Sequence, residues 1–302
     1  MKKSLQSPGA CRRWGGFATS LLLPVCLLAI LGCSRTGEAE GGVQPVLLVV
    51  SFGTSFNDSR EKTIGAVERA ITAAFPDYEI RRAFTSQIII DKLKERDGLE
   101  IDNVREAMER LVRDGVKEVA VQPTQVMNGF EYDDTIAEIK SYESRFSSIK
   151  YGRPLLSSDA DYQEVINALT EGTKQYNDGS TAVIFMGHGT GHAANAAYGR
   201  LNDALKAAGH DHYIIGTVEA EPSIEDVAAA AKGLGVKRAV LSPLMIVAGD
   251  HATNDMAGDE DDSWKSILEA DGFEVAINLR GLGEYPGIQT LFVNHAKDAI
   301  GR

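Results

Sequence analysis

The chain has 302 residues, with 31 Lys and Arg against 43 Asp and Glu, which gives a net charge of −12 at pH 7. No basic cluster of the kind that neutralises phosphates is present, which argues against nucleic acid as a partner. A cation suits so acidic a protein better. The length is enough for one large domain or two of ordinary size.

The first 32 residues have the pattern of a secretion signal. Four basic residues precede an apolar run over 17–31, which is too short for a comfortable membrane span. Ile30-Leu31-Gly32-Cys33 follows, and this ending resembles the lipobox of bacterial lipoproteins, in which the cysteine becomes the lipidated first residue. We therefore expect residues 1–32 to be a signal peptide and 33–44 a flexible tether. The protein would be exported, periplasmic and anchored to the membrane by a lipid on Cys33; an ordinary secretion signal or an uncleaved anchor is the alternative.

Loss of the signal would change both the charge and the cysteine content. It removes four basic residues and no acidic ones, which leaves 27 against 43 and a net charge of −16. Cys11 and Cys26 leave with the signal, so the mature chain keeps only Cys33 and has no internal disulfide. A metal site in it must use imidazoles and carboxylates without thiolates.

From residue 45 onward, apolar runs of strand length alternate with segments of helical periodicity. Strands are expected over 45–52, 79–84, 117–122, 182–187, 213–218, 237–242 and 273–278. Helices are expected over 59–74, 102–113, 133–145, 161–175, 193–208, 223–233, 259–270 and 286–299. Strands separated by helices of this length are typical of βαβ units and parallel sheets.

Two pairs of segments repeat one another. Residues 115–131 and 235–251 share Gly, Val, Lys and Pro in step, and these copies end on Glu131 and His251. Residues 45–54 and 182–190 also match, with His188 where the first copy has Phe52. Such self-similarity indicates a duplicated unit. The sequence therefore predicts an α/β fold with two similar parallel-sheet domains flanked by helices, pseudo-twofold related, over 45–153 and 154–302; the last helix is the one element that could instead pack on the first domain.

All six histidines lie in the second half. His188 and His251 follow predicted strands, at the carboxyl edge where open α/β sheets bind ligands, and Glu131 would face them across a cleft between the halves. His192 is an outer candidate, as a hydrogen-bond partner or proton acceptor. The other three are expected to be structural or exposed: His210, His212 and His295.

Other chemistries have little support in the sequence. A Gly-x-Ser-x-Gly elbow, a phosphate-binding loop and the dinucleotide-binding glycine spacing are missing, so no organic cofactor is expected. The acidic stretch over 250–262 fits a solvated loop followed by the first turn of a helix. Beside His251 it would also concentrate a divalent cation.

Several strings resemble the CbiK-type sirohydrochlorin cobaltochelatases, which are class II tetrapyrrole chelatases. They are Ser51-Phe52-Gly53-Thr54-Ser55, Asn128-Gly129-Phe130-Glu131-Tyr132, Phe185-Met186-Gly187-His188-Gly189 and Ala248-Gly249-Asp250-His251-Ala252-Thr253-Asn254-Asp255-Met256. The resemblance covers residues 45 to 300. It implies two α/β domains around a cleft that receives a tetrapyrrole, insertion of Co²⁺ into sirohydrochlorin in the anaerobic cobalamin pathway, and a metal held by His188, His251 and Glu131.

Insertion sets requirements that these side chains can meet. Co²⁺ must shed water and the macrocycle must lose two pyrrole protons. Two neutral imidazoles hold a borderline ion loosely enough to release it, and Glu131 would complete the coordination or accept a proton, with His192 as the second choice of acceptor. The carboxylates of sirohydrochlorin would be bound by individual groups of the protein: Arg82, Lys92, Lys94 and the backbone turns at Gly53 and Gly189.

Two other functions stay open on the sequence. Cobalamin precursors are made in the cytoplasm, so an exported protein with this scaffold could instead be a carrier of a metal, haem or another tetrapyrrole. The same residues could also insert iron into sirohydrochlorin or a porphyrin. Fe²⁺ or Ni²⁺ is therefore an alternative substrate metal to Co²⁺, and a homo-oligomer is compatible with the sequence.

Overall fold

The computed structural model describes residues 43–302. The predicted signal peptide, Cys33 and nearly all of the predicted tether lie outside the described residues. Within them, none of the helices is long and apolar enough to cross a membrane.

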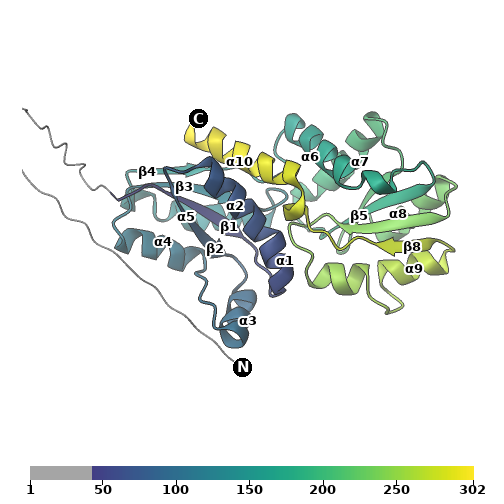
Figure 1. Ribbon diagram of the computed structural model, residues 1–302, viewed down its shortest axis with the longest axis horizontal. Coiled ribbons are helices and arrows are strands. Elements are labelled where there is room, and N and C mark those ends of the chain that lie inside the picture. The colour runs from purple at the N-terminus through teal and green to yellow at the C-terminus, as the bar shows by residue number, and fades with distance from the viewer. Residues whose placement is uncertain (1–42) are drawn as a thin grey trace, which may run out of the picture. The chain divides into compact units, whose positions relative to one another are not determined.

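Two four-stranded parallel sheets form the framework (Figure 1). The first has the order β2-β1-β3-β4 and contains β1 (Val46–Ser51), β2 (Glu79–Phe84), β3 (Glu118–Pro123) and β4 (Ser148–Tyr151). The second has the order β6-β5-β7-β8 and contains β5 (Thr181–Gly187), β6 (Tyr213–Thr217), β7 (Arg238–Pro243) and β8 (Glu274–Ile277). The same strand order occurs twice, which confirms the predicted α/β fold of two similar parallel sheets.

Helices connect the strands in both halves. The first half contains α1 (Asn57–Lys62), α2 (Ile64–Ala74), α3 (Gln87–Asp97), α4 (Val104–Arg113), α5 (Phe130–Lys140) and the 3₁₀ turn η1 (Glu143–Arg145). The rest of the chain contains α6 (Asp159–Gly172), η2 (Lys174–Tyr176), η3 (Ala193–Asn195), α7 (Ala196–Ala207), α8 (Ile224–Gly233), the π-helical turn η4 (Ala252–Met256), α9 (Trp264–Ala270), η5 (Leu282–Glu284) and α10 (Pro286–Ile300).

Both faces of each sheet are covered, and alternate residues of the central strands reach opposite cores. In β1, Leu47 and Val49 pack with α2 and α10, whereas Val46, Leu48 and Val50 pack with α4. In the second sheet, β5 likewise divides its side chains between a core with α7 and a core with α8 and α9. A strand that is buried on both faces has a continuous apolar sequence. These strands could therefore be predicted from the sequence.

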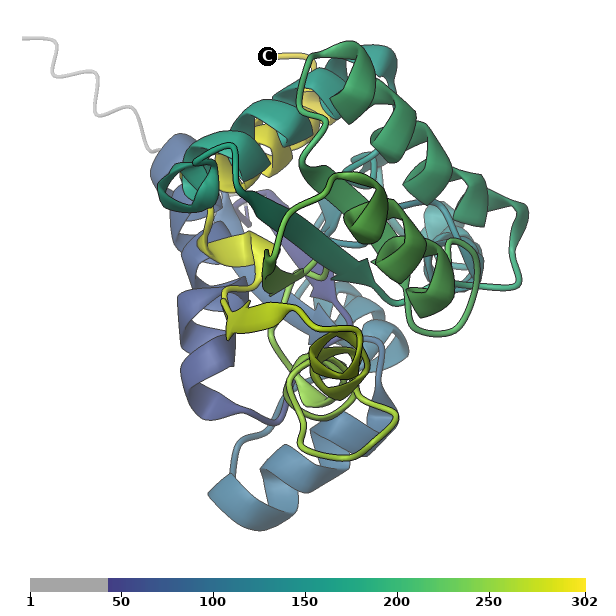
Figure 2. The same ribbon diagram turned by 90° about the vertical axis from the view of Figure 1, so that its right-hand side faces the viewer.

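The helix that follows the last strand of each sheet packs against the other sheet's half of the molecule. After β4 the chain enters α6, which packs on α7 beside the second sheet. After β8 it enters α10, which packs on α2 and β3 of the first half and also on α6 (Figures 1 and 2). One apolar core therefore extends from the first sheet through α6 and α10 to the second sheet. The predicted boundary near residue 154 falls between β4 and α6.

Some local predictions were wrong. The helix expected over 59–74 breaks at Thr63, where φ is −109° and ψ is −81°. The Thr63 hydroxyl donates to Ser59 O, a side-chain bond that competes with helix continuation. The acidic residues 259–262 precede α9 instead of forming its first turn, because Ser263 caps that helix. Two elements were not expected: α3, whose apolar residues are contiguous rather than periodic, and β4, a half-buried edge strand.

A buried pair joins the two crossing helices. His295 Nε2 of α10 lies 3.0 Å from Asp161 Oδ1 of α6, and its Nδ1 lies 3.1 Å from Arg153 O. Their side chains are only 1% and 5% exposed, so His295 is structural. Burial by itself would raise the pKa of Asp161, but the hydrogen bonds from His295 and Ser158 outweigh it and leave this pKa below its ordinary value.

We expect Asp161→Asn to lower the free energy of unfolding by about 3 kcal/mol at pH 7, because it removes the charged acceptor of a buried hydrogen bond from His295. A carboxyl with a lowered pKa stabilises the fold above the ordinary aspartate range, near pH 4. That contribution is lost as the pH falls through the lowered pKa. Urea unfolding between pH 7 and pH 3 measures the difference. The control is Asp159→Asn, an exposed residue of the same helix; an equal loss in the control, or a difference independent of pH, would contradict the assignment.

Candidate metal site

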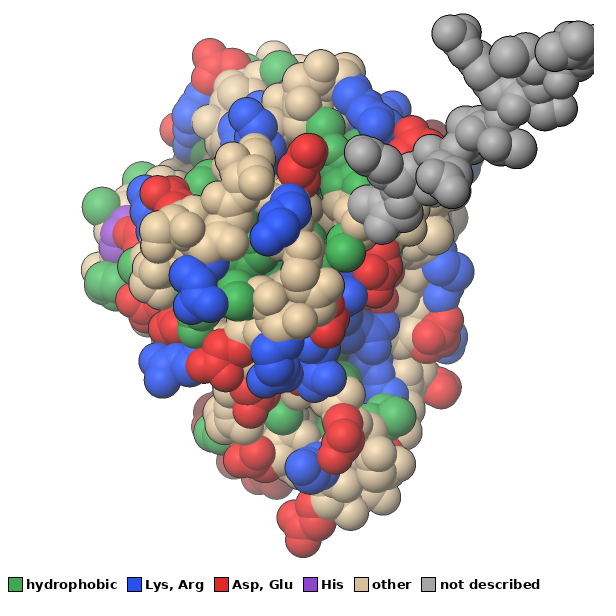
Figure 3. Space-filling view, turned by 90° about the vertical axis from the view of Figure 1, so that its left-hand side faces the viewer, with side chains coloured by type: hydrophobic (Ala, Val, Ile, Leu, Met, Phe, Trp, Pro, Cys, Tyr) green, Lys and Arg blue, Asp and Glu red, His purple; other side chains and the backbone are tan. Residues whose placement is uncertain are grey.

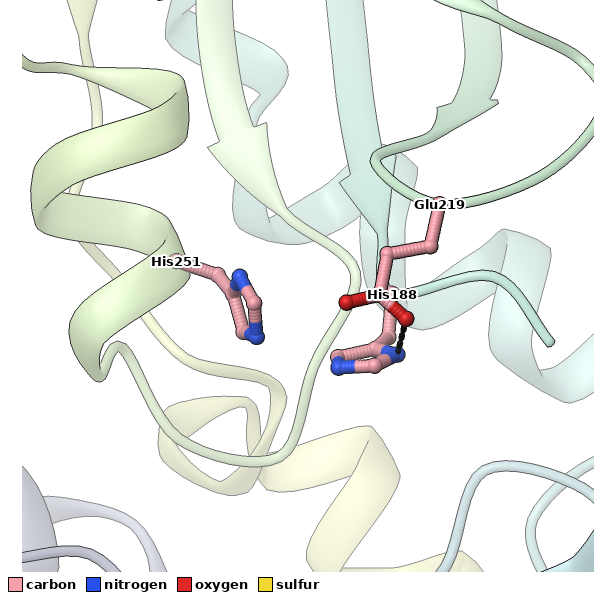
Figure 4. Close-up of side chains that lie close together, drawn as sticks. All are labelled: His188, Glu219 and His251. Carbon is pink, nitrogen blue, oxygen red and sulfur yellow. Dashed lines mark ion pairs between the residues drawn. The ribbon is translucent and has the colours of Figure 1, made fainter.

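Three neighbouring strands of the second sheet end at one edge, and each is followed by a residue that can bind a metal. His188 follows β5, Glu219 follows β6, and His251 follows β7 at the turn before η4. One ligand atom from each lies within 4.8 Å of the other two (Figure 4). The ring centroids of His188 and His251 are 4.5 Å apart. Among residues 43–302, this is the one group of three His, Cys, Asp or Glu side chains that meets this geometry.

Two glycines fix the turn that carries His188. A β-carbon at Gly187 would overlap the ring of Tyr198, and Gly189 has a φ of +87°, in the left-handed region that side chains disfavour. The N–H of Gly189 also donates to the Tyr198 hydroxyl at 3.4 Å. Burial raises the pKa of Tyr198, so its hydroxyl stays protonated at neutral pH. The imidazole is therefore presented from a rigid turn.

Hydrogen bonds select the metal-binding nitrogen of both rings. His188 Nδ1 lies 3.0 Å from Gly189 O, and a carbonyl oxygen only accepts, so Nδ1 carries the proton. His251 Nδ1 lies 2.6 Å from the carboxylate of Asp255, which fixes the same tautomer. Each ring thus keeps a lone pair on Nε2 for a metal. In metal sites, the ring N–H of a histidine ligand, which does not bind the metal, usually donates a hydrogen bond to a carboxylate or a carbonyl oxygen.

The site is open to solvent. The side chains of His188 and Glu219 are 47% and 54% exposed, and that of His251 is 35% exposed. Glu219 Oε2 lies 3.6 Å from His188 Nδ1. Two imidazoles and one carboxylate suit a borderline divalent cation, and three protein ligands leave further positions on the ion free. The arrangement can accept an ion from solution and pass it to another set of donors.

Glu131 lies in the first half and is not a member of this group. It stands in the first turn of α5, where its Oε1 accepts hydrogen bonds from Thr85 Oγ1 at 2.6 Å and from Gln125 Nε2 at 2.8 Å. With Phe52 and Thr85 it lines a separate hollow of about 420 Å³. Of the three predicted ligands, the structure brings His188 and His251 together and places Glu131 apart from them.

The internal repeat accounts for two separate clusters of side chains. Equivalent backbone hydrogen bonds position Glu131 in the first half and His251 in the second. Ser86 N donates to Phe52 O at 3.2 Å, and Glu219 N donates to His188 O at 2.9 Å. The helices that carry Glu131 and His251 both begin after a glycine whose carbonyl accepts the N–H four residues on, at 3.0 Å in each case. Phe52, Ser86 and Glu131 are therefore the first-half counterparts of His188, Glu219 and His251. Each copy of the repeat builds its own strand-edge cluster.

Sequence reasoning missed Glu219, although a signal for it existed. The residue stands directly after the strand expected over 213–218, at the same carboxyl edge as the two histidines. Asp255 lies within one of the strings that resemble the family, and sequence reasoning gave it no role. For Glu219 the signal is its position after a strand, and for Asp255 it is the i,i+4 spacing from His251 on a helical turn.

His192 does not join the metal group. Its Nδ1 accepts from Ala194 N at 3.0 Å and caps η3. Its ring packs edge-on against Phe130 with centroids 4.8 Å apart, and its Nε2 lies 3.6 Å from Asp133. His192 therefore connects the turn after β5 to the start of α5 in the first half.

The predicted contacts for substrate carboxylates have different surroundings. Arg82 is engaged by Glu68, and Lys94 lies 3.4 Å from Glu100. Lys92 is exposed and lines a hollow of about 380 Å³ together with Arg96. The turns at Gly53 and Gly189 both have positive φ.

Acidic and basic side chains are mixed on the surface. Figure 3 shows Lys and Arg side chains beside Asp and Glu side chains on the face that it presents, so the negative charge is not gathered there in one patch.

The repeated sheets and the open site of two imidazoles and a carboxylate define a metal-binding protein of the chelatase type. A solved structure with this fold, SirB from Bacillus subtilis with Fe³⁺, aligns with a TM-score of 0.61 at 17% identity and covers 85% of this chain and 96% of its own. The family model for cobalt chelatase (CbiK) matches residues 45–301. The chain belongs to this family, as its motifs predicted.

Two curated relatives support the same family assignment. The sirohydrochlorin cobaltochelatase of Salmonella typhimurium is 42% identical over 258 residues, which cover 85% of this chain and 97% of the relative. The sirohydrochlorin cobaltochelatase CbiKC of Nitratidesulfovibrio vulgaris is 33% identical over 256 residues, with 84% and 90% covered.

We expect Glu219→Gln and Asp255→Asn each to weaken Co²⁺ binding about 10- to 100-fold, because the first removes a ligand charge and the second releases His251 from its tautomer. Titration of the protein with Co²⁺, without a tetrapyrrole, measures this. Glu225→Gln, an exposed change on α8, is the matched control. Wild-type affinity in both test variants would exclude this site.

Proposed function

We propose that this protein is a sirohydrochlorin cobaltochelatase, which inserts Co²⁺ into sirohydrochlorin. The observation that carries the proposal is the convergence of His188, Glu219 and His251 on one open point in a member of the cobalt chelatase family. In this proposal Co²⁺ is a substrate that the protein holds and then releases.

The metal triad, His188, Glu219 and His251, would deliver the ion. The Nε2 atoms of the two histidines, with the carboxylate of Glu219, would replace part of its water shell. Neutral imidazoles and a single carboxylate bind less tightly than thiolates would, which suits transfer to four ring nitrogens. The ligands also come from one half, so the ion would leave toward the opposite half.

Glu131 is the proposed acceptor of a pyrrole proton. Both of its protein donors bond to Oε1, and none of the described residues donates to Oε2. This oxygen is therefore free for a substrate N–H. Because Glu219 supplies the carboxylate of the metal triad, Glu131 is free to act as a base. Thr85 and Gln125 hold it in place.

We expect Glu131→Gln to lower kcat for insertion by about 100-fold or more, the scale of general base catalysis, and to leave Co²⁺ affinity unchanged. Absorbance of the metallated ring gives kcat, and a metal titration gives the affinity. Glu109→Gln, an exposed change on α4 outside the hollow that Glu131 lines, should keep normal turnover. An unchanged kcat in Glu131→Gln would reject the role of base, and weakened Co²⁺ binding would make Glu131 a ligand.

The carrier function competes with catalysis because the N-terminal sequence predicts export. One experiment separates the two functions: a catalytic amount of the protein is mixed with excess sirohydrochlorin and Co²⁺ or Fe²⁺, and ring absorbance is followed. Many turnovers with Co²⁺ are expected. Metallation limited to one equivalent would favour a carrier, and faster turnover with Fe²⁺ would favour iron insertion.

We also propose that the protein is exported to the periplasm and anchored by a lipid on Cys33, on the pattern of residues 1–33. In cells fed a labelled fatty acid, the wild-type protein should carry label and fractionate with membranes, and Cys33→Ser should lose both properties. Labelling of Cys33→Ser equal to wild type would reject the anchor.

A further inference from the structure

Two phenylalanines are left exposed at the carboxyl edge of the first sheet. Phe52, directly after β1, is 53% exposed, and Phe130, at the start of α5, is 59% exposed. Neither belongs to an apolar core of the described residues. Large apolar side chains that do not support folding are characteristic of binding surfaces.

Both residues lie next to segments that carry the metal triad. The loop after Phe52 reaches the second half, where a β-carbon on Gly249 would lie 3.7 Å from Thr54 Oγ1, and Gly249 closely precedes His251. Phe130 contacts the ring of His192, which lies on the turn after His188. Both phenylalanines thus lie on segments of the first half that contact the segments carrying His188 and His251.

The repeat shows that this difference between the halves is systematic. Phe52 occupies the place of His188, and Phe130 occupies the place of Asp250 in the matched turn. Where the second half has metal-binding and acidic side chains, the first half has aromatic ones. Glu131 follows Phe130 directly in the chain, and it lines one hollow together with Phe52.

We propose that Phe52 and Phe130 form the surface on which one face of the tetrapyrrole rests, while the metal triad addresses its other face. This inference rests on the proposed function. The faces of a conjugated macrocycle are flat and apolar and its carboxylates lie at the rim, so aromatic side chains match the faces. A protein with a net charge of −12 gains such contact without attracting the carboxylates. The arrangement also brings Glu131 to the ring face opposite the incoming ion, where a pyrrole N–H is accessible.

The test is equilibrium binding of metal-free sirohydrochlorin, followed by its own absorbance. We expect Phe52→Ala to raise Kd about tenfold, the scale expected when an aromatic ring is removed from a binding surface, and Phe130→Leu to raise it severalfold. Co²⁺ affinity and Tm should not change, because both rings are largely exposed. Phe52→Tyr keeps the ring and should retain binding.

The matched control is Phe56→Ala, which changes a phenylalanine of the same loop that is 40% exposed and lines the other hollow. It should bind sirohydrochlorin as the wild type does. Unchanged Kd in Phe52→Ala and Phe130→Leu, or an equal loss in Phe56→Ala, would overturn the inference. Failure of the proposed function gives a different result, since wild-type protein would then bind the ring without turning it over.

Discussion

Parallel strands of one sheet end at one edge, and the metal site depends on this constraint. β6, β5 and β7 are neighbours, so the residues that follow them must lie close together. His188 and Glu219 follow their strands within two residues, whereas the loop over 244–250 brings His251 to the same edge. The short bonds from Nδ1 of each histidine to an oxygen leave Nε2 as the nitrogen that could bind an ion. The strand order brings the three residues close together, and these hydrogen bonds determine which nitrogen of each histidine is available as a ligand.

Because the unit is duplicated, the first sheet has a carboxyl edge with the same arrangement of strands as the second. The helices α6 and α10, which follow the two sheets, join the two halves of the molecule. Because α6 packs against the second half and α10 against the first, the halves share a core and hold the buried pair Asp161–His295. A division of roles follows. In the proposed function, one edge would bind the ion, and the other would provide a carboxylate and exposed aromatic side chains. Insertion of a metal into a flat ring needs both kinds of surface, with the ring between them.

Much of this architecture could be predicted from the sequence, because the central strands are continuous apolar runs and the repeat fixes the topology of both halves. Edge strand β4 and helix α3 could not, since partial exposure removes the pattern by which such elements are identified. His188 and His251 were found from their places after strands. The repeat predicted Glu131 as the third ligand, opposite the two histidines. The end of the neighbouring strand β6 adds Glu219 as a candidate that the sequence did not single out.

The central claim is that the ion is held by the edge of the second sheet alone. The most direct measurement is a crystal structure of the protein soaked with Co²⁺ in the absence of a tetrapyrrole, with the metal located by its anomalous signal. The account predicts a single strong site within bonding distance of His188 Nε2, His251 Nε2 and a carboxylate oxygen of Glu219, with Glu131 still bonded to Thr85 and Gln125. Glu131 in the coordination sphere in place of Glu219, or cobalt bound elsewhere, would contradict it.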